Sequence, residues 1–126
     1  MNDLVAFLKA RLDEDEQLAR AAGNRQWLVQ DNTIELYPEH EDDGYMRWPT
    51  RADARHAANW EPARVLREIE AKRLILSWHG AVKNDKTPWG QPVQICRCGY
   101  DLPCGTLRFL ALPYADHEDY QEAWKP

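Results

Sequence analysis

The sequence lacks a long apolar run. No stretch of it approaches the ~20 apolar residues that a membrane-spanning helix needs. The opening segment, MNDLVAFLKARLDEDE, becomes charged too soon for a secretory signal peptide. We therefore expect a chain that has no membrane partner and resides in the cytoplasm.

The short motifs that mark several enzyme classes are also missing. The sequence contains no GxxxxGK[ST] phosphate loop, no GxGxxG, GxSxG or HExxH segment and no H-x-E pair. These absences remove the positive arguments for an enzyme. A metal-dependent or thiol-dependent enzyme is kept as an alternative.

Cysteine is scarce, and its distribution is uneven. The chain has three cysteines, and all of them lie in the segment CRCGYDLPC, residues 96–104. An odd count suits no complete set of disulfides, and in a reducing compartment clustered cysteines more often bind metal. Zinc favours thiolate and imidazole ligands in tetrahedral arrangement. We therefore predict that Cys96, Cys98 and Cys104 are three ligands of a structural Zn²⁺.

A histidine would complete such a site, and His79 is the best candidate. It ends the long helix predicted over residues 61–80, on the same stripe as Ile69 and Leu76, and so faces inward. His56 and His117 are the weaker alternatives, and His40 lies in an acidic loop.

The cysteines also have two interpretations without metal. One is a redox-active pair with a resolving third thiol, although such pairs usually take the form C-x-x-C at a helix start, whereas this chain has C-R-C. The other is three small buried core residues. We favour metal, and with three thiolates the ion would be a poor Lewis acid and therefore structural rather than catalytic.

Length and composition are those of one globular domain over residues 1–126, with 44% hydrophobic and 29% charged side chains. Six tryptophans are many for this length. Because an aromatic ring is a large apolar surface, we expect most of them to pack in the core or along a helix seam.

The formal net charge of −5 is unevenly distributed. Residues 1–46 carry four basic and eleven acidic side chains, residues 47–110 carry eleven basic and six acidic, and residues 111–126 carry one basic and four acidic. We interpret the basic side chains of residues 47–110 as a helix surface that is exposed to solvent. The alternative is a nucleic-acid footprint.

In that alternative, a set of arginines spaced four residues apart would contact phosphates, with Trp48 or Trp60 available for stacking. The arginines are Arg47, Arg51 and Arg55.

Helical periodicity and capping residues predict five helical segments. Residues 3–22 carry one apolar stripe, Thr50 and Asp53 form a capping pair for a short helix, and residues 61–80 have Pro in the first turn and Gly after the end. Residues 104–112 form another short helix. A final helix is expected from Asp116, with Tyr120 and Trp124 on one face and packed on the long helix.

Alternating apolar residues predict a small antiparallel sheet. Residues 25–37 form a hairpin around Asp31-Asn32, and residues 45–48 supply a third strand after the acidic loop 38–44. Residues 81–92 are expected to be a loop and 93–95 a short strand. The fold class is therefore α+β: an N-terminal helix, a hairpin or three-stranded sheet, a long central helix, a Cys-rich zinc loop and two short C-terminal helices.

Three phrases of the sequence resemble a known family: DLVAFLKARLDEDE, PARVLREIEAKR and PCGTLRFLALPYADHEDYQEAW. They are similar to an uncharacterised domain-of-unknown-function family of actinobacteria and their phages. Its members tend to carry aspartate at the position of Glu61 and a wider spacing at that of Cys96 and Cys98. The resemblance implies no activity.

These observations favour a zinc-binding module with a non-catalytic role in macromolecular binding or regulation. Another protein is the first expected partner, and nucleic acid is the alternative.

Overall fold

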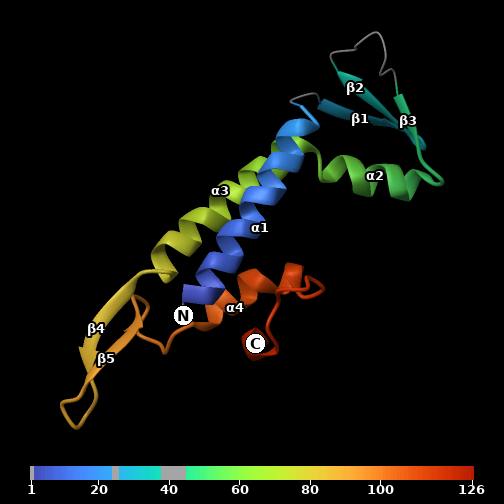
Figure 1. Cartoon of the computed structure of the whole chain (residues 1–126). Helices are drawn as coiled ribbons and strands as arrows, with labels where there is room; N and C mark the ends of the chain where they lie inside the picture. Colours follow the sequence, from blue (N-terminus) through green and yellow to red (C-terminus); the bar gives the residue numbers. More distant parts are fainter. Residues whose placement is uncertain (1, 24–25, 38–44) are drawn as a thin grey trace. The chain divides into compact units, whose positions relative to one another are not determined.

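The computed structural model describes residues 2–23, 26–37 and 45–126 and has an α+β fold, as the sequence predicts (Figure 1). In chain order its elements are α1 (Asn2–Ala21), β1 (Gln26–Gln30), β2 (Thr33–Tyr37), β3 (Tyr45–Arg47), α2 (Arg51–Asn59), α3 (Pro62–His79), β4 (Val82–Lys86), β5 (Pro92–Cys96), α4 (Gly105–Ala111) and the 3₁₀ turns η1 (Leu112–Tyr114) and η2 (Glu122–Trp124).

The chain divides into two compact units. Residues 1–13 and 70–126 form unit 1, and residues 14–69 form unit 2. The boundaries fall within α1 and α3, so each of these helices contributes residues to both units. A single domain over residues 1–126 stays a prediction.

Unit 2 contains a three-stranded antiparallel sheet in the order β1-β2-β3. Asp31, at positive φ (52°), makes the tight turn between the first two strands. Helix α2 packs against this sheet, and Ile34, Leu36 and Ala54 form their common buried cluster. The predicted hairpin and third strand are confirmed; the acidic loop 38–44 lies outside the described residues.

Capping determines where α2 begins. The Thr50 hydroxyl accepts from the Asp53 amide at 3.1 Å and donates to the Asp53 carboxylate at 2.7 Å. An N-cap of this kind satisfies a backbone donor that has no partner within the helix. The cap expected from the sequence is confirmed.

Unit 1 has an apolar core built on the first turns of α1. Leu4, Leu8 and Leu12 are at most 2% exposed, and Leu76 of α3 and Leu107 of α4 are buried with them. Fully burying each leucine contributes on the order of 1.5–3 kcal/mol. Their spacing of three to four residues on α1 is the stripe that the sequence predicts.

The segment after α3 is a β-hairpin, which corrects the loop expected over residues 81–92. β4 pairs with β5 in antiparallel register, from Val82 opposite Cys96 to Lys86 opposite Pro92. All five residues of β4 are exposed. β4 therefore has no apolar alternation, and its conformation depends on pairing with β5.

The C-terminal segment differs from the expected final helix. Residues 115–119 form turns and a bend, residues 120–121 are irregular, and the 3₁₀ turn η2 follows them. The ring of Phe7 on α1 explains the difference, because it contacts Tyr120 at 6.1 Å and Trp124 at 5.0 Å between centroids. These rings thus pack on α1, and their packing on the long helix stays a prediction.

Tryptophan burial also departs from expectation. Trp124 is buried, and Trp27 and Trp48 are half-buried, whereas Trp60, Trp78 and Trp89 are exposed. Among the helices of the described residues, none has both the length and the apolar character needed to cross a membrane.

Candidate metal centre

Four side chains of unit 1 converge in space. His79, Cys96, Cys98 and Cys104 each offer one donor atom, and these four atoms all lie within 4.8 Å of one another. They come from three separate places in the chain: the end of α3, the end of β5 with the turn after it, and the start of α4. This group could hold a metal ion.

His79 is held at the group by α3. Ile69 and Leu76 are 3% and 4% exposed, so the stripe that ends at His79 faces the interior. The backbone carbonyl of His79 accepts from the Cys96 thiol at 3.3 Å. The imidazole is thereby placed beside the cysteines by both helix packing and a local contact.

A tight turn brings Cys96 and Cys98 together. The Cys96 amide donates to the Tyr100 carbonyl and the Gly99 amide to the Cys96 carbonyl, both at 2.9 Å. Gly99 has φ of 96°, a conformation that side chains with a Cβ rarely adopt. The Cys98 amide also points at the Cys96 sulfur, at 3.5 Å, and a backbone donor there stabilises negative charge on sulfur.

Cys104 occupies the N-cap of α4 and makes no side-chain cap hydrogen bond. It is 2% exposed. Its sulfur therefore does not cap the helix. It lies 3.5 Å from Nδ1 of His79.

The separations match those within a tetrahedral zinc site. Zn–S bonds of ~2.3 Å and Zn–N bonds of ~2.0–2.1 Å place sulfur and nitrogen about 3.5–3.6 Å apart. Nδ1 of His79 lies 3.6 Å from the Cys96 sulfur and 3.5 Å from that of Cys104. These two separations are therefore those of a site in which His79 coordinates through Nδ1.

The electrostatic environment treats the cysteines differently. The backbone amide of Tyr100 lowers the pKa of Cys98 to about 7, so much of this thiol is ionised near neutral pH. Burial raises the pKa of Cys96 to about 11. A cation has to displace the proton from Cys96, because zinc binds the thiolate rather than the thiol.

The other histidines do not join this group among the described residues. His117 contacts the guanidinium of Arg11 and stacks edge-on against Phe7. His56 lies on α2, in unit 2, and is exposed. His40 lies outside the described residues. Of the candidates that the sequence offers, the structure places His79 beside all three cysteines.

A cavity of about 290 Å³ adjoins the group. Besides His79, Cys98 and Cys104, its lining is Tyr100, Gly105, Thr106 and Phe109. This lining contains no carboxylate and no lysine. A base that could activate metal-bound water is therefore missing from it.

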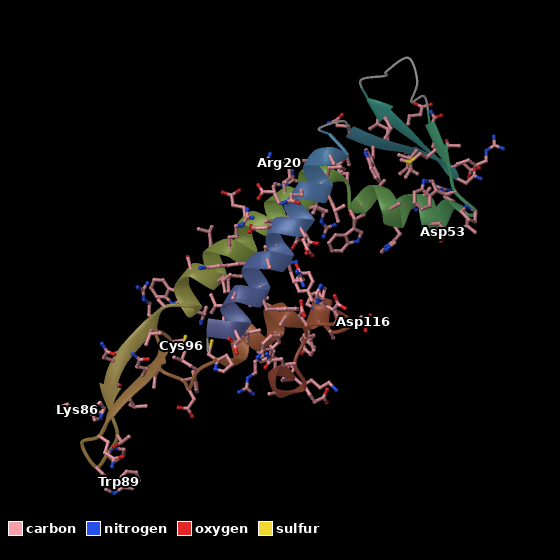
Figure 2. The ribbon with its side chains drawn as sticks, in the orientation of Figure 1. Arg20, Asp53, Lys86, Trp89, Cys96 and Asp116 are labelled. Atoms are coloured by element: carbon pink, nitrogen blue, oxygen red, sulfur yellow. The ribbon has the colours of Figure 1, made fainter. Side chains whose placement is uncertain are left out.

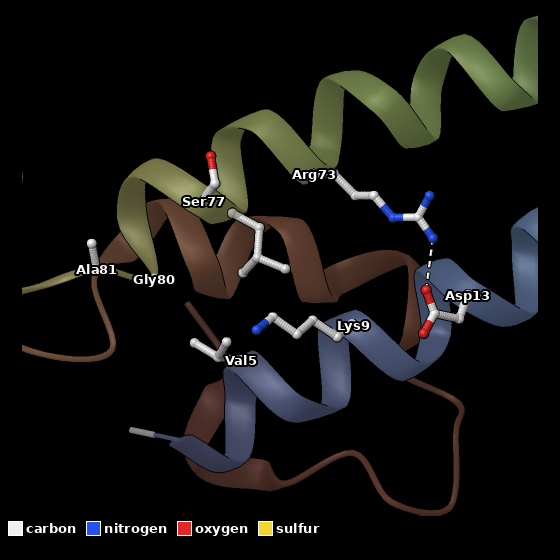
Figure 3. A pocket seen from close by; sticks show the side chains of 8 residues that line it. Val5, Lys9, Asp13, Arg73, Ser77, Gly80 and Ala81 are labelled. Carbon is white, nitrogen blue, oxygen red and sulfur yellow. Dashed lines mark hydrogen bonds and ion pairs between the residues drawn. The ribbon is translucent and has the colours of Figure 1, made fainter.

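A second hollow, of about 480 Å³, lies between α1 and α3 in unit 1 (Figure 3). Lys9 extends into it beside Val5, and Arg73 donates to the Asp13 carboxylate at 2.6 Å. Asp13 is the one carboxylate of this lining and is engaged by that ion pair. The cysteine group is thus the better metal site of the two.

The sequence analysis does not predict the β4–β5 hairpin, whose base adjoins the group of His79 and the three cysteines. Figure 2 labels Cys96 at its base and Trp89 at its far end. Trp89 is 85% exposed. The signal that could have revealed the hairpin is the turn sequence Thr87-Pro88-Trp89-Gly90, in which Gly90 has φ of 80°.

A protein-family model matches the chain over residues 1–126, and its description is a family of unknown function, DUF6221. The chain belongs to the DUF6221 family. The match includes residues 25–48, which the sequence resemblance left unplaced, and spans the cysteine group and the hairpin. No curated protein and no solved structure matches this DUF6221 chain.

Proposed function

We propose that His79, Cys96, Cys98 and Cys104 hold one structural Zn²⁺ ion in a non-catalytic binding module. The observation that carries the proposal is the convergence of three thiols and one imidazole within 4.8 Å, at sulfur–nitrogen separations that suit tetrahedral zinc. Thiolate ligands favour zinc over magnesium or calcium, which bind oxygen.

The donor set supports a structural rather than a catalytic ion. Four protein ligands fill the tetrahedral coordination sphere, whereas catalytic zinc keeps one position for water or substrate. The adjoining cavity supplies no general base. A metal-dependent or thiol-dependent enzyme is therefore the weaker alternative.

The ion would join three segments of unit 1 that are separate along the chain. His79 ends α3, Cys96 ends β5, and Cys104 precedes α4. Since all residues of β4 are exposed, the hairpin has little core to fix its base. Zinc would supply that anchor and hold the hairpin ready to bind a partner.

The proposal also includes the cellular location, the origin and the partner of the protein. The clustered cysteines of the sequence favour the cytoplasm, where thiols stay reduced. An origin in actinobacteria or their phages remains an expectation from the sequence resemblance. Another protein is the first expected partner of this module, and nucleic acid is the alternative.

Elemental analysis of the full-length protein, purified without chelator, tests the proposal. We expect one zinc per chain. Replacement by Co²⁺ should give the visible absorption of tetrahedral thiolate coordination, and Cys104→Ser should weaken those bands. Folded protein without any metal, or a cobalt spectrum of octahedral type, would contradict the proposal.

A further inference from the structure

Exposed aromatic side chains lie on the β4–β5 hairpin and on the segments of unit 1 that adjoin its base. Trp89 is 85% exposed, Tyr100 73%, Phe109 60% and Trp78 54%. Of the large aromatic residues that are exposed in the described chain, only Trp60 lies elsewhere. Exposing such rings to water is unfavourable, and aromatic residues grouped in this way mark binding surfaces.

Cations accompany these aromatic side chains. Residues 78–100 contain three basic side chains, Lys83, Lys86 and Arg97, and one acidic side chain, Asp85. Both lysines lie on the exposed strand β4. The hairpin is thus locally positive in a chain whose net charge is −5.

One arginine is already stacked on an aromatic ring. The guanidinium of Arg97 lies 4.7 Å from the ring centroid of Trp78. This arrangement leaves a flat cationic group at the base of the hairpin, with Tyr100 three residues further along the chain. Guanidinium planes and aromatic rings both stack on nucleobases.

The strand register distributes these groups along the hairpin. Lys83 lies opposite Ile95, and Lys86 lies opposite Pro92, close to the turn that carries Trp89. Successive side chains face opposite sides of a strand, so Lys83 and Lys86, three positions apart on β4, lie on opposite faces of the hairpin. Arg97 lies in the turn that follows the end of β5. Cationic groups are therefore present from the base of the hairpin to its far end, where Figure 2 labels Lys86 and Trp89.

We propose that the two faces, the turn and the base of this hairpin, together called the hairpin surface and defined as Trp78, Lys83, Lys86, Trp89, Arg97 and Tyr100, bind single-stranded nucleic acid. Rings that stack on bases and cations that neutralise phosphates are the two components of such sites. Stacking requires unpaired bases, which favours a single strand over a duplex. The proposal deepens the proposed function, because it names the partner of the zinc-anchored hairpin.

The positive charge separates this partner from an apolar protein surface. An apolar partner would leave Lys83, Lys86 and Arg97 to be desolvated without a counter-charge, which is costly. A polyphosphate chain supplies that counter-charge at regular spacing. The surface also differs from the one drawn from sequence, Arg47, Arg51 and Arg55, which lies in unit 2.

The test is fluorescence anisotropy of the full-length, zinc-loaded chain with labelled twelve-nucleotide oligo-dT and oligo-rU. DNA and RNA both offer bases that stack and phosphates that carry charge. Comparing the dissociation constants of the two oligonucleotides shows which of them the chain binds more tightly. We expect binding whose dissociation constant rises with salt. For three phosphate contacts with a single strand, the logarithm of the association constant should fall against the logarithm of the salt concentration with a slope of about −2.

Matched variants locate the surface. Trp89→Ala should weaken binding about tenfold, which corresponds to the loss of one stacked base, and Trp89→Phe should retain most of it. The double variant Lys83→Ala/Lys86→Ala should reduce the slope to about −1. Trp60→Ala and Arg51→Ala/Arg55→Ala are the controls, and both should bind like the unmodified chain.

Zinc content measured on the same samples separates this proposal from the metal proposal. Zinc-loaded protein that binds neither oligonucleotide overturns the hairpin proposal alone and leaves a protein as the partner. Binding that is lost in the α2 control but not in the hairpin variants overturns it as well. Zinc-free protein that still binds through Trp89 supports the hairpin surface and overturns the metal centre.

Discussion

The sulfur of Cys104 lies 3.5 Å from Nδ1 of His79, although 25 positions of sequence separate the two residues. Between them the chain forms the whole β4–β5 hairpin and the turn that carries Cys96 and Cys98. This contact closes the hairpin at its base. Two properties can therefore be changed separately. One is the stability of this contact at the base of the hairpin, and the other is the exposure of the side chains at its far end.

Removal of metal should loosen one part of the chain only. Zinc binding to small peptides releases on the order of 10–16 kcal/mol, which is comparable to the stability of a whole domain. With EDTA we expect faster amide hydrogen exchange over residues 80–112. The amides of Ile34 and Leu36 should stay protected, because their buried cluster with Ala54 lies in unit 2 and contains no metal ligand.

Hydrogen exchange with mass spectrometric readout measures this difference directly. The first turns of α1 should also retain much of their protection, since Leu4 and Leu8 are buried by apolar contacts. Unchanged protection over residues 93–112 after chelation would mean that the cysteines are ordinary core residues.

The two kinds of ligand should differ in their importance. Cys104→Ser removes a buried thiolate, whereas His79→Ala removes a half-buried imidazole that water can replace. We therefore expect both variants to lose zinc affinity, with a smaller loss for His79→Ala, as measured by competition with a chromophoric chelator. His56→Ala is the matched histidine control, and an equal effect of that variant would show that His79 is no ligand.

Much of the fold could be predicted because its signals are local. Caps and apolar spacing placed α1, α2 and α3, and alternation around Asp31-Asn32 placed the first hairpin. The cysteine cluster and the inward stripe ending at His79 likewise selected the four residues that the structure brings together. In each of these cases, neighbouring residues in sequence carry the information.

The errors occurred where distant partners decide the conformation. After Val82, β4 is polar on both faces, and its pairing with β5 makes it a strand. The C-terminal rings have the spacing of one helix face, but Tyr120 and Trp124 contact Phe7, which is more than a hundred positions away in the sequence. The segment forms turns instead of a helix. Tryptophan burial is not predictable in the same way, because the sequence does not show which rings will meet a partner from a distant segment, as Trp124 meets Phe7.

The α2 cap offers a test within unit 2. Thr50→Ala removes the hydroxyl that accepts from the Asp53 amide, and such a loss typically costs about 1 kcal/mol. Urea denaturation should show this decrease, while zinc content stays unchanged. Thr50→Ser keeps the oxygen and should restore most of the stability; a serine variant as unstable as the alanine variant would contradict the capping role.

The last prediction concerns the C-terminal segment. Trp124 is 6% exposed and packs on Phe7, whereas Trp89 is 85% exposed, so the two tryptophans form a matched pair. Trp124→Ala should cost about 3–5 kcal/mol, because it leaves a cavity beside α1. Trp89→Ala should change stability by less than about 0.5 kcal/mol.

Thermal unfolding followed by circular dichroism would measure both. For a unit of this size, the loss at Trp124 corresponds to a decrease of at least about 10 °C in Tm. Truncation after Pro113 should lower Tm further, since it also removes Tyr120 and the contact of His117 with the buried Arg11. Equal melting of the truncated and complete chains would show that residues 114–126 do not stabilise α1, and the packing of Trp124 on Phe7 would then contribute nothing to the fold.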